Sequence, residues 1–346
     1  MDNTTPDNGS HILEVNGLST YFYSIHGVAK AVNNVSFNLK RGEILGIVGE
    51  SGCGKSVTSL SIVRLIQSPP GKIVEGEIIF DGTNLLTYTE QQMRDIRGDK
   101  ISMIFQEPMT SLNPLYTIGN QISEMFIRHN GYDRKKALAE SVEMLKKVQI
   151  PNAEARVREY PHQMSGGMRQ RVMIAMALAC NPEILIADEP STALDVTIQA
   201  QVLDLMLQLK KTYDTAIILI THDLGVIAEV AERVAVMYAG QIVEEALVED
   251  IFDDPLHPYT RSLLKSIPIL GERFEKEGRV ELNEIKGIVP SLYALPPGCN
   301  FYPRCPDARP ECNEAAVPIV LTNDQRKVRC ILYNGLDLDE AANKMI

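Results

Sequence analysis

The sequence predicts an α/β fold with a mainly parallel β-sheet. Three short apolar runs, Ile184–Ala187, Ala216–Ile220 and Val234–Tyr238, alternate with stretches of helical periodicity. Strands that are buried on both faces are continuously apolar, and their alternation with helices is typical of a parallel sheet. The 45% share of hydrophobic residues is enough for a sizeable core.

The N-terminal part has a different pattern, with short runs of β-forming residues. Leu13–Val15 and Val35–Phe37 are two such runs, and Gly71–Gly82 is typical of a hairpin with Glu77–Phe80 as a strand. We therefore expect an antiparallel β part at the N-terminal end of the fold.

A mainly helical region follows, from about residue 89 to residue 171. Lys135–Val148 has the spacing of an amphipathic helix, and Ile101–Phe105 is the one strand expected within the region. The pattern predicts a helical subdomain inserted into the sheet-forming part.

The length of 346 residues exceeds that of a usual single domain, so we expect one large domain and an appendage. We assign residues 1–10 to a flexible N-terminus and residues 11–270 to the main domain. Residues 271–346, in which prolines cluster, form a small irregular C-terminal module.

The charge balance excludes one class of partner. A net charge of −11 argues against nucleic-acid binding through a broad basic face. No apolar run reaches the roughly 18 residues of a membrane-spanning helix, and the polar first ten residues do not resemble a secretory signal. We expect a cytoplasmic location, in which thiols stay reduced.

A glycine-rich loop, Gly49–Ser56, follows the apolar strand Ile44–Val48 and opens a helix. This context is the one that the phosphate-binding pattern GxxxxGKS requires, because backbone N–H groups at a helix N-terminus cradle phosphate oxygens. Lys55 is expected to reach the β- and γ-phosphates, and Ser56 to bind magnesium. The loop predicts an ATPase that uses Mg²⁺. Its candidate nucleotide-binding residues are Gly49, Ser51, Gly52, Cys53, Gly54, Lys55, Ser56 and Val57.

A helix is expected after this loop, because apolar residues recur there at helical spacing. The residues at helical spacing are Val57, Leu60, Val63 and Leu65.

Two adjacent carboxylates end the strand Ile184–Ala187. We assign Asp188 to magnesium and Glu189 to the general base that activates the attacking water. A structural alternative is that the pair only caps the segment that follows.

Two further polar residues follow predicted strands. His222 comes after Ala216–Ile220 and could hydrogen-bond the γ-phosphate, and Gln106 after Ile101–Phe105 could ligate magnesium. Ligands of open α/β sheets bind at the carboxyl ends of strands, which is where both residues are expected.

A second potential anion site occurs at Ser165-Gly166-Gly167, directly before an apolar helix. A serine hydroxyl and glycine amides at a helix start can bind phosphate, although a simple serine N-cap has the same pattern.

These motifs together resemble the ABC transporter ATPases over about residues 11–270. The Walker A loop, Q-loop, signature, Walker B strand, D-loop and switch histidine correspond in order to Gly49–Ser56, Gln106, Ser165–Gly167, Asp188–Glu189, Ala193–Asp195 and His222. The resemblance implies two ATP molecules held between two ATPase subunits, each between one subunit's P-loop and its partner's signature.

The resemblance also assigns single residues. It implies that Phe22 stacks on adenine and that Asp195 of the D-loop belongs to the nucleotide site. One departure is Met168, which stands where the signature normally has glutamine and leaves the equivalence of the two ATP sites open.

Two segments resemble the dipeptide, oligopeptide and nickel importer ATPases in particular: residues 106–114 and 257–264. This likeness implies a peripheral subunit at the cytoplasmic face of the membrane. It also implies a homologous second ATPase, two transmembrane permease subunits that contact about residues 107–125, and an extracytoplasmic solute-binding protein. A nickel or other solute importer remains an alternative, as does a soluble non-transport ABC ATPase.

Four cysteines, Cys299, Cys305, Cys312 and Cys330, lie in the C-terminal module. Four thiolates suit either structural zinc or a [4Fe–4S] cluster, and their spacing does not distinguish the two. Resemblance to the D-type subunits of dipeptide importers favours the iron–sulfur cluster.

Overall fold

The computed structural model describes residues 11–106, 111–190, 196–267 and 284–333. The chain divides into two compact units. The first comprises Met1–Glu14, Asn38–Ile44 and Ile79–Ile220, and the second comprises Val15–Phe37, Leu45–Ile78 and Thr221–Ile346. Within the described ranges, no helix has both the length and the apolar character needed to cross a membrane.

The first unit contains three parallel strands, β6 (Ile101–Ile104), β7 (Ile184–Asp188) and β8 (Ala216–Ile220). Strand β7 lies between the other two, with Ile184 opposite both Ile101 and Ala216. Every residue of β7 and β8 is buried. The parallel pairing predicted from the apolar runs is confirmed for these strands.

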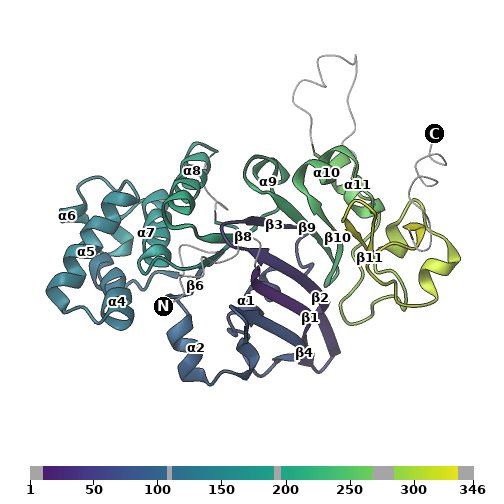
Figure 1. The fold of residues 1–346 in the computed structure, drawn as a ribbon, viewed down its shortest axis with the longest axis horizontal. Helices are drawn as coiled ribbons and strands as arrows, with labels where there is room; N and C mark the ends of the chain where they lie inside the picture. Colours follow the sequence, from purple (N-terminus) through teal and green to yellow (C-terminus); the bar gives the residue numbers. More distant parts are fainter. Residues whose placement is uncertain (1–10, 107–110, 191–195, 268–283, 334–346) are drawn as a thin grey trace, which may run out of the picture. The chain divides into compact units, whose positions relative to one another are not determined.

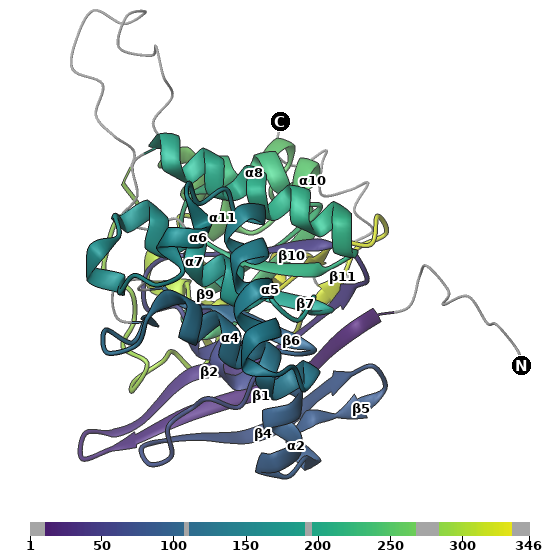
Figure 2. The ribbon, with the colours of Figure 1, turned by 90° about the vertical axis from the view of Figure 1, so that its left-hand side faces the viewer.

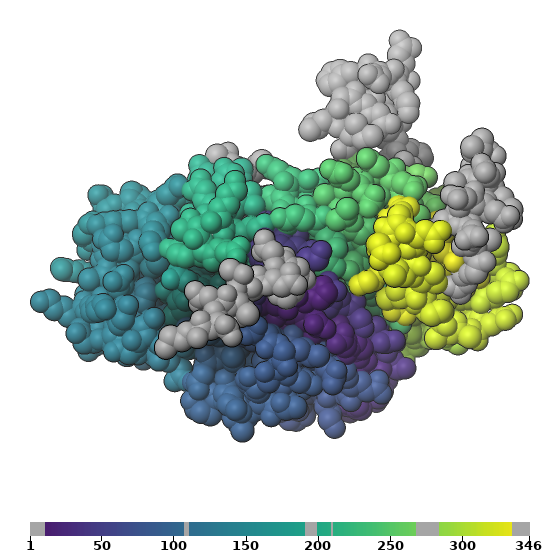
Figure 3. Space-filling model, viewed as in Figure 1, coloured from purple at the N-terminus to yellow at the C-terminus, as the bar shows by residue number. Residues whose placement is uncertain are grey.

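Helices make up most of the rest of the first unit, as the sequence predicts for residues 89–171. They are α2 (Glu90–Ile96), α4 (Ile118–Asn130), α5 (Arg134–Lys147), α6 (Ala153–Arg156), α7 (Gly166–Leu178) and α8 (Val196–Tyr213), with 3₁₀ turns at Leu85–Thr87 and Pro161–Gln163. Helices α4 and α5 pack on each other and both contact α7 (Figures 1 and 2). Figure 3 shows the surface of this group in teal.

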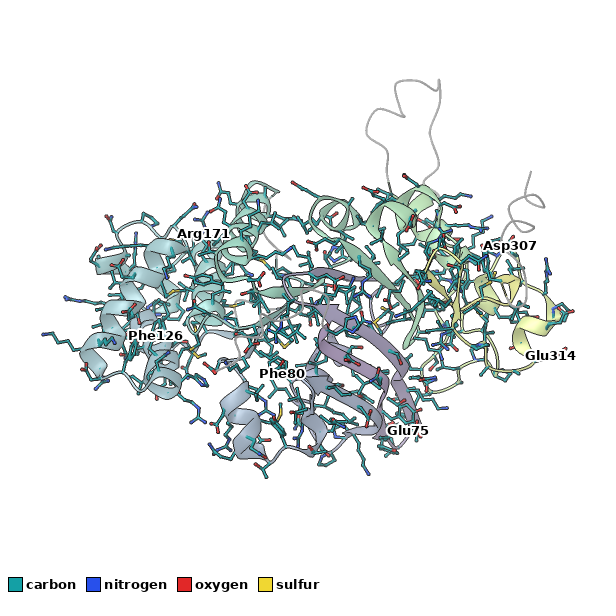
Figure 4. All side chains as sticks on the ribbon, in the orientation of Figure 1. Glu75, Phe80, Phe126, Arg171, Asp307 and Glu314 are labelled. Atoms are coloured by element: carbon teal, nitrogen blue, oxygen red, sulfur yellow. The ribbon has the colours of Figure 1, made fainter. Side chains whose placement is uncertain are left out.

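Local sequence explains where α4 and α5 begin and how they pair. The hydroxyl of Thr117 accepts a hydrogen bond at the start of α4, and the Asp133 carboxylate does so at the start of α5. Between the helices, the buried hydroxyls of Ser123 and Ser141 lie 2.9 Å apart and are hydrogen-bonded. Phe126, labelled in Figure 4, stacks on Tyr132 in the connecting turn.

The second unit contains a sheet with the order β11-β12-β10-β9-β3. Strands β3 (Ile44–Val48) and β9 (Arg233–Tyr238) are parallel, whereas β10 (Gln241–Leu247) pairs antiparallel with β9. Strand β10 and the two-residue strands β11 (Val320–Leu321) and β12 (Lys327–Val328) were not expected from the sequence. Strand β12 pairs with β10, so part of the C-terminal module extends this sheet.

The N-terminal strands are longer than the short runs that indicated them. Strands β2 (Gly27–Lys40), β1 (His11–Ser24) and β4 (Gly71–Phe80) are neighbours in this order. The end of β4 forms the predicted hairpin with β5 (Thr83–Asn84). Its turn residues Asp81 and Gly82 both have positive φ, as tight hairpin turns require.

Among its described residues, the second unit has the helices α1 (Lys55–Ile62), α9 (Leu224–Val230), α10 (Val248–Asp253) and α11 (Pro258–Lys265). They are followed by 3₁₀ turns at Tyr302–Arg304, Pro310–Asn313 and Ile331–Tyr333.

The helix predicted after the loop is present as α1, and its apolar residues Val57 and Leu60 are only half-buried. The helix ends at Ile62, and its buried face carries the hydroxyl residues Thr58, Ser59 and Ser61. Each hydroxyl bonds to a helix carbonyl, and that of Ser61 also pairs with Thr20. Small hydroxyl side chains can be buried because the preceding turn satisfies them.

The packing of α4 predicts that Gly119→Ala destabilises the protein, although alanine is normally the better helix former. A Cβ at Gly119 would lie 2.6 Å from the Val157 carbonyl oxygen, which is backbone and cannot rotate away. We expect the free energy of unfolding to fall by about 1–3 kcal/mol in urea titrations followed by circular dichroism. Asn120→Ala, at the exposed neighbouring position, is the control and should change it by less than about 0.5 kcal/mol.

Candidate functional site

The glycine-rich loop joins β3 to α1 in the second unit, and its glycines have conformations that other residues rarely adopt. The φ angles of Gly49, Gly52 and Gly54 are 151°, 78° and 106°. A Cβ at Gly54 would lie only 2.3 Å from the Ala31 carbonyl oxygen, so the loop passes directly over the backbone of β2. Glycine is needed here both for the backbone angle and for the space.

Lys55 is folded over this loop. Its side chain is buried, and its ammonium nitrogen donates hydrogen bonds to the carbonyls of Gly49 at 2.7 Å and Glu50 at 3.2 Å. The Cys53 sulfur is also buried, 3.7 Å from that nitrogen, and burial raises the pKa of the Cys53 thiol. The loop thus holds a buried cation against two of its own carbonyls, and this positive charge suits the loop to bind an anion.

The other predicted phosphate-site residues line the same turn of chain. Ser51 and Gly52 are exposed at the loop tip, while Ser56 and Val57 are half-buried in the first turn of α1. Phe22 is half-buried on β1, with its ring edge close to Gly71.

His222 also belongs to the second unit, and it is exposed. The N–H of the preceding Thr221 donates to the carbonyl of Ile47 in β3, which places His222 next to the strand that leads into the loop. Asp223 then caps α9 by accepting from the N–H groups of Gly225 and Val226. The second unit thus brings together the loop and the predicted switch histidine.

The predicted acidic residues lie in the first unit, at the end of β7. Asp188 is buried, and Glu189 is half-buried with a positive φ of 48°. The Glu189 N–H donates to the Ile220 carbonyl at 2.8 Å, which fixes this unusual backbone. The side-chain amide of Gln106 donates to the Glu189 carboxylate at 3.3 Å, so the structure brings these two predicted residues together.

The predicted signature forms the start of α7, also in the first unit. Ser165 caps the helix by accepting from the Met168 N–H at 3.3 Å, and both Ser165 and Gly166 are exposed. Gly167 is half-buried. The buried side chain of Gln170 donates to the Pro190 carbonyl and thereby joins α7 to the segment after Glu189.

Sequence reasoning missed Gln170. Gln170 lies five residues after the signature serine, and nothing in the neighbouring sequence indicates that its side chain is buried. Asp195, predicted for the nucleotide site, and residues 107–110 of the predicted permease contact lie outside the described residues.

The four C-terminal cysteines line one small pocket in the second unit. Cys299, Cys305, Cys312 and Cys330 share it with His257 and Asp307, and Figure 4 labels Asp307. Burial raises the pKa of Cys305 to about 11 and that of Cys330 to about 12, so both thiols are protonated at neutral pH. In the part of the chain that the structure describes, no three His, Cys, Asp or Glu side chains are arranged to hold a metal ion. The expectation of a formed metal site is therefore not supported, although the donor residues do converge.

Comparison with known proteins supplies the family. The ABC transporter family matches residues 32–192, and the family described as the oligopeptide/dipeptide transporter C-terminal region matches residues 243–312. The oligopeptide transport ATP-binding protein AppD of Bacillus subtilis is 54% identical over 324 residues, covering 94% of this chain and 97% of that protein. This chain belongs to the ATP-binding subunits of the oligopeptide/dipeptide ABC transporter family.

Other relatives agree with this family. The dipeptide transport ATP-binding protein DppD of Bacillus subtilis is 49% identical, covering 93% of this chain and 95% of that protein. The dimeric structure of MJ0796, a bacterial ABC transporter cassette, matches with a TM-score of 0.61 and 29% identity, covering 68% of this chain and 98% of that chain. The fold is thus the P-loop fold of ABC ATPases, and the chain is an ATP-hydrolysing transporter subunit.

The geometry of the loop predicts that Gly54→Ala prevents normal ATP binding. The added Cβ must displace either the loop or the Ala31 backbone. We expect the affinity for ATP to fall more than about tenfold in calorimetric titrations, because displaced N–H groups no longer converge on the phosphates. Gly82→Ala is the control: it has the same type of φ, 78°, with nothing within 4 Å, and should keep wild-type affinity. Equal affinity of both variants would contradict the assigned role of the loop.

Proposed function

We propose that this chain powers the uptake of di- and oligopeptides by a membrane ABC importer. The proposal rests on one observation: 93–94% of this chain matches oligopeptide and dipeptide transport ATP-binding proteins. The match of residues 243–312 to the C-terminal region of such transporters points the same way, because this region lies outside the match to the general ABC family.

In this proposal ATP lies on the Gly49–Ser56 loop, with Phe22 stacked on adenine. Lys55 leaves its two loop carbonyls and turns its charge to the β- and γ-phosphates. Ser56, Gln106 and Asp188 would hold Mg²⁺, which would supply positive charge to neutralise the terminal phosphates.

Glu189 acts as the general base and accepts a proton from the attacking water. Its contact with the Gln106 amide supports this role, since the amide fixes one carboxylate oxygen and orients the other. His222 donates a hydrogen bond to the γ-phosphate. The exposed position of its side chain beside β3 is consistent with that contact.

The nucleotide sites form between two ATPase subunits. Ser165, Gly166, Gly167 and Asp195 of this chain complete the site of a homologous second ATPase, whose signature completes this one. The exposed Ser165 and Gly166 at the start of α7 leave backbone N–H groups available for such a contact. Closure of the two ATPase subunits on ATP drives the membrane subunits to switch access, and ATP hydrolysis returns them to the starting state.

The wider assembly follows from the family. The chain is a peripheral subunit on the cytoplasmic face of the membrane, beneath two transmembrane permease subunits that receive solute from an extracytoplasmic binding protein. Residues 11–270 form the nucleotide-binding domain, with a helical subdomain at about 89–171 and a permease contact at about 107–125. Residues 271–346 form the C-terminal extension.

We further propose that Cys299, Cys305, Cys312 and Cys330 bind a [4Fe–4S] cluster. The convergence of four thiols on one pocket supports this, and the cluster would join four loop segments that have little regular structure. The pocket has a volume of about 20 Å³, so binding must widen it as the thiols deprotonate. Zinc is the alternative for the same donors.

Glu189→Gln should nearly abolish ATP turnover and ATP-dependent uptake of a labelled dipeptide by the reconstituted transporter, while ATP still binds. The amide keeps the shape of the side chain but cannot accept the proton, and loss of general-base catalysis costs about 10²–10⁴-fold. Glu183→Gln, the same change just before β7, is the control and should keep wild-type turnover. Unchanged turnover in Glu189→Gln would reject the assigned base, and ATP-driven uptake of nickel in place of dipeptide would reject the substrate class.

Anaerobically purified protein should contain iron and acid-labile sulfide in equal amounts, and Cys330→Ser should lose both. Cys180→Ser is the control, because Cys180 lies in the first unit and outside the cysteine pocket. Stoichiometric zinc without sulfide would identify zinc as the bound metal. Wild-type protein that contains neither iron nor zinc would refute the proposed metal site.

A further inference from the structure

Arg304, in the C-terminal extension, reaches the glycine-rich loop. Its guanidinium forms a bidentate ion pair with Glu50, the residue after Gly49, at 2.6 and 3.0 Å. The Arg304 side chain is 3% exposed and that of Glu50 26%. A bidentate pair between a guanidinium and a carboxylate is among the strongest and most directional side-chain contacts in proteins, and here its arginine is almost fully buried.

The guanidinium is also held by groups outside the loop, two of them in the extension and one in β9. It donates to the carbonyls of Lys286 and Ile285 and to the hydroxyl of Tyr238. The Glu50 carboxylate and this hydroxyl raise the pKa of Arg304, so the residue is permanently charged. Arg304 therefore presents a rigid positive charge to the loop.

Glu50 occupies a critical place in the loop. Its N–H donates to the buried hydroxyl of Tyr259 at 2.9 Å, and its carbonyl accepts from Lys55. Its side chain also adds a negative charge to a loop that is built to receive phosphate. An unpaired carboxylate at this position would repel ATP, because like charges repel strongly where water is partly excluded.

We propose that Arg304 is a positioning residue of the ATP site. It neutralises Glu50 and holds the Glu50 side chain away from the phosphates, so ATP affinity depends on the C-terminal extension. This inference rests on the proposed binding of ATP to Gly49–Ser56. It makes ATP binding depend on Arg304, a residue outside the loop motif.

The test is the affinity of the full-length chain for ATP, measured by calorimetry with Mg²⁺. Arg304→Gln keeps a side chain that can donate to the neighbouring carbonyls but removes the charge. It should weaken binding about tenfold. Arg304→Lys keeps the charge but cannot form the bidentate pair, so its affinity should lie between those of wild type and Arg304→Gln.

The decisive variant is Glu50→Gln combined with Arg304→Gln. It has no carboxylate to neutralise, so it should recover most of the lost affinity. A purely structural role of Arg304 predicts no such recovery. Arg326→Gln is the matched control: Arg326 is a buried arginine of the same extension, paired with Asp254 and without contact to the loop. Its ATP affinity should equal that of wild type.

The outcomes separate this inference from the proposed function. Wild-type protein that does not bind ATP would refute the loop assignment itself. The role of Arg304 would be refuted if Arg304→Gln bound ATP as tightly as wild type. It would also be refuted if the double variant bound ATP as weakly as Arg304→Gln. If Arg304→Gln does not fold, the double variant decides alone: affinity near wild type supports neutralisation, and a tenfold loss refutes it.

Discussion

The geometry of the glycine-rich loop depends on backbone contacts that come from distant parts of the second unit. Gly54 lies against the Ala31 carbonyl of β2, and the N–H of Gly240 donates to the Cys53 carbonyl. The hydroxyl of Tyr259 accepts from the Glu50 N–H. These partners come from β2, from the turn between β9 and β10, and from α11, and together they hold the loop backbone in place.

The first unit organises its acidic residues in a comparable way. The left-handed backbone of Glu189 is unfavourable for a residue with a Cβ, and its N–H bond to Ile220 of β8 maintains it. Gln170 adds a contact from α7 to Pro190, so the start of the signature helix and the end of β7 are joined by a side chain. The strained backbone of Glu189 thus lies at the residue to which the general-base role is assigned.

The C-terminal extension is part of the second unit's core. The ring of Phe301 lies 5.2 Å from that of Tyr238 and 5.3 Å from that of Tyr259, centroid to centroid, and β12 pairs with β10. Cys305 directly follows Arg304, so the cysteine pocket and the ion pair to the loop share one short segment. The extension therefore joins three features that the sequence presents as separate: the sheet, the thiols and the phosphate loop.

The sequence by itself determined the features that depend on neighbours in the chain. The parallel strands follow from continuous apolar runs, and the loop from glycines at fixed spacing next to a strand and a helix. Tertiary structure decided the rest. Strand β10 carries buried Glu244 and Glu245, whose partners include the N–H of Leu256 and the side chain of Lys327. Two adjacent charged residues do not indicate a buried strand in the sequence, because their partners are brought to them only by the folded structure. The pairing of Glu50 with Arg304 spans 254 residues, and no local pattern encodes a contact that only the folded chain creates.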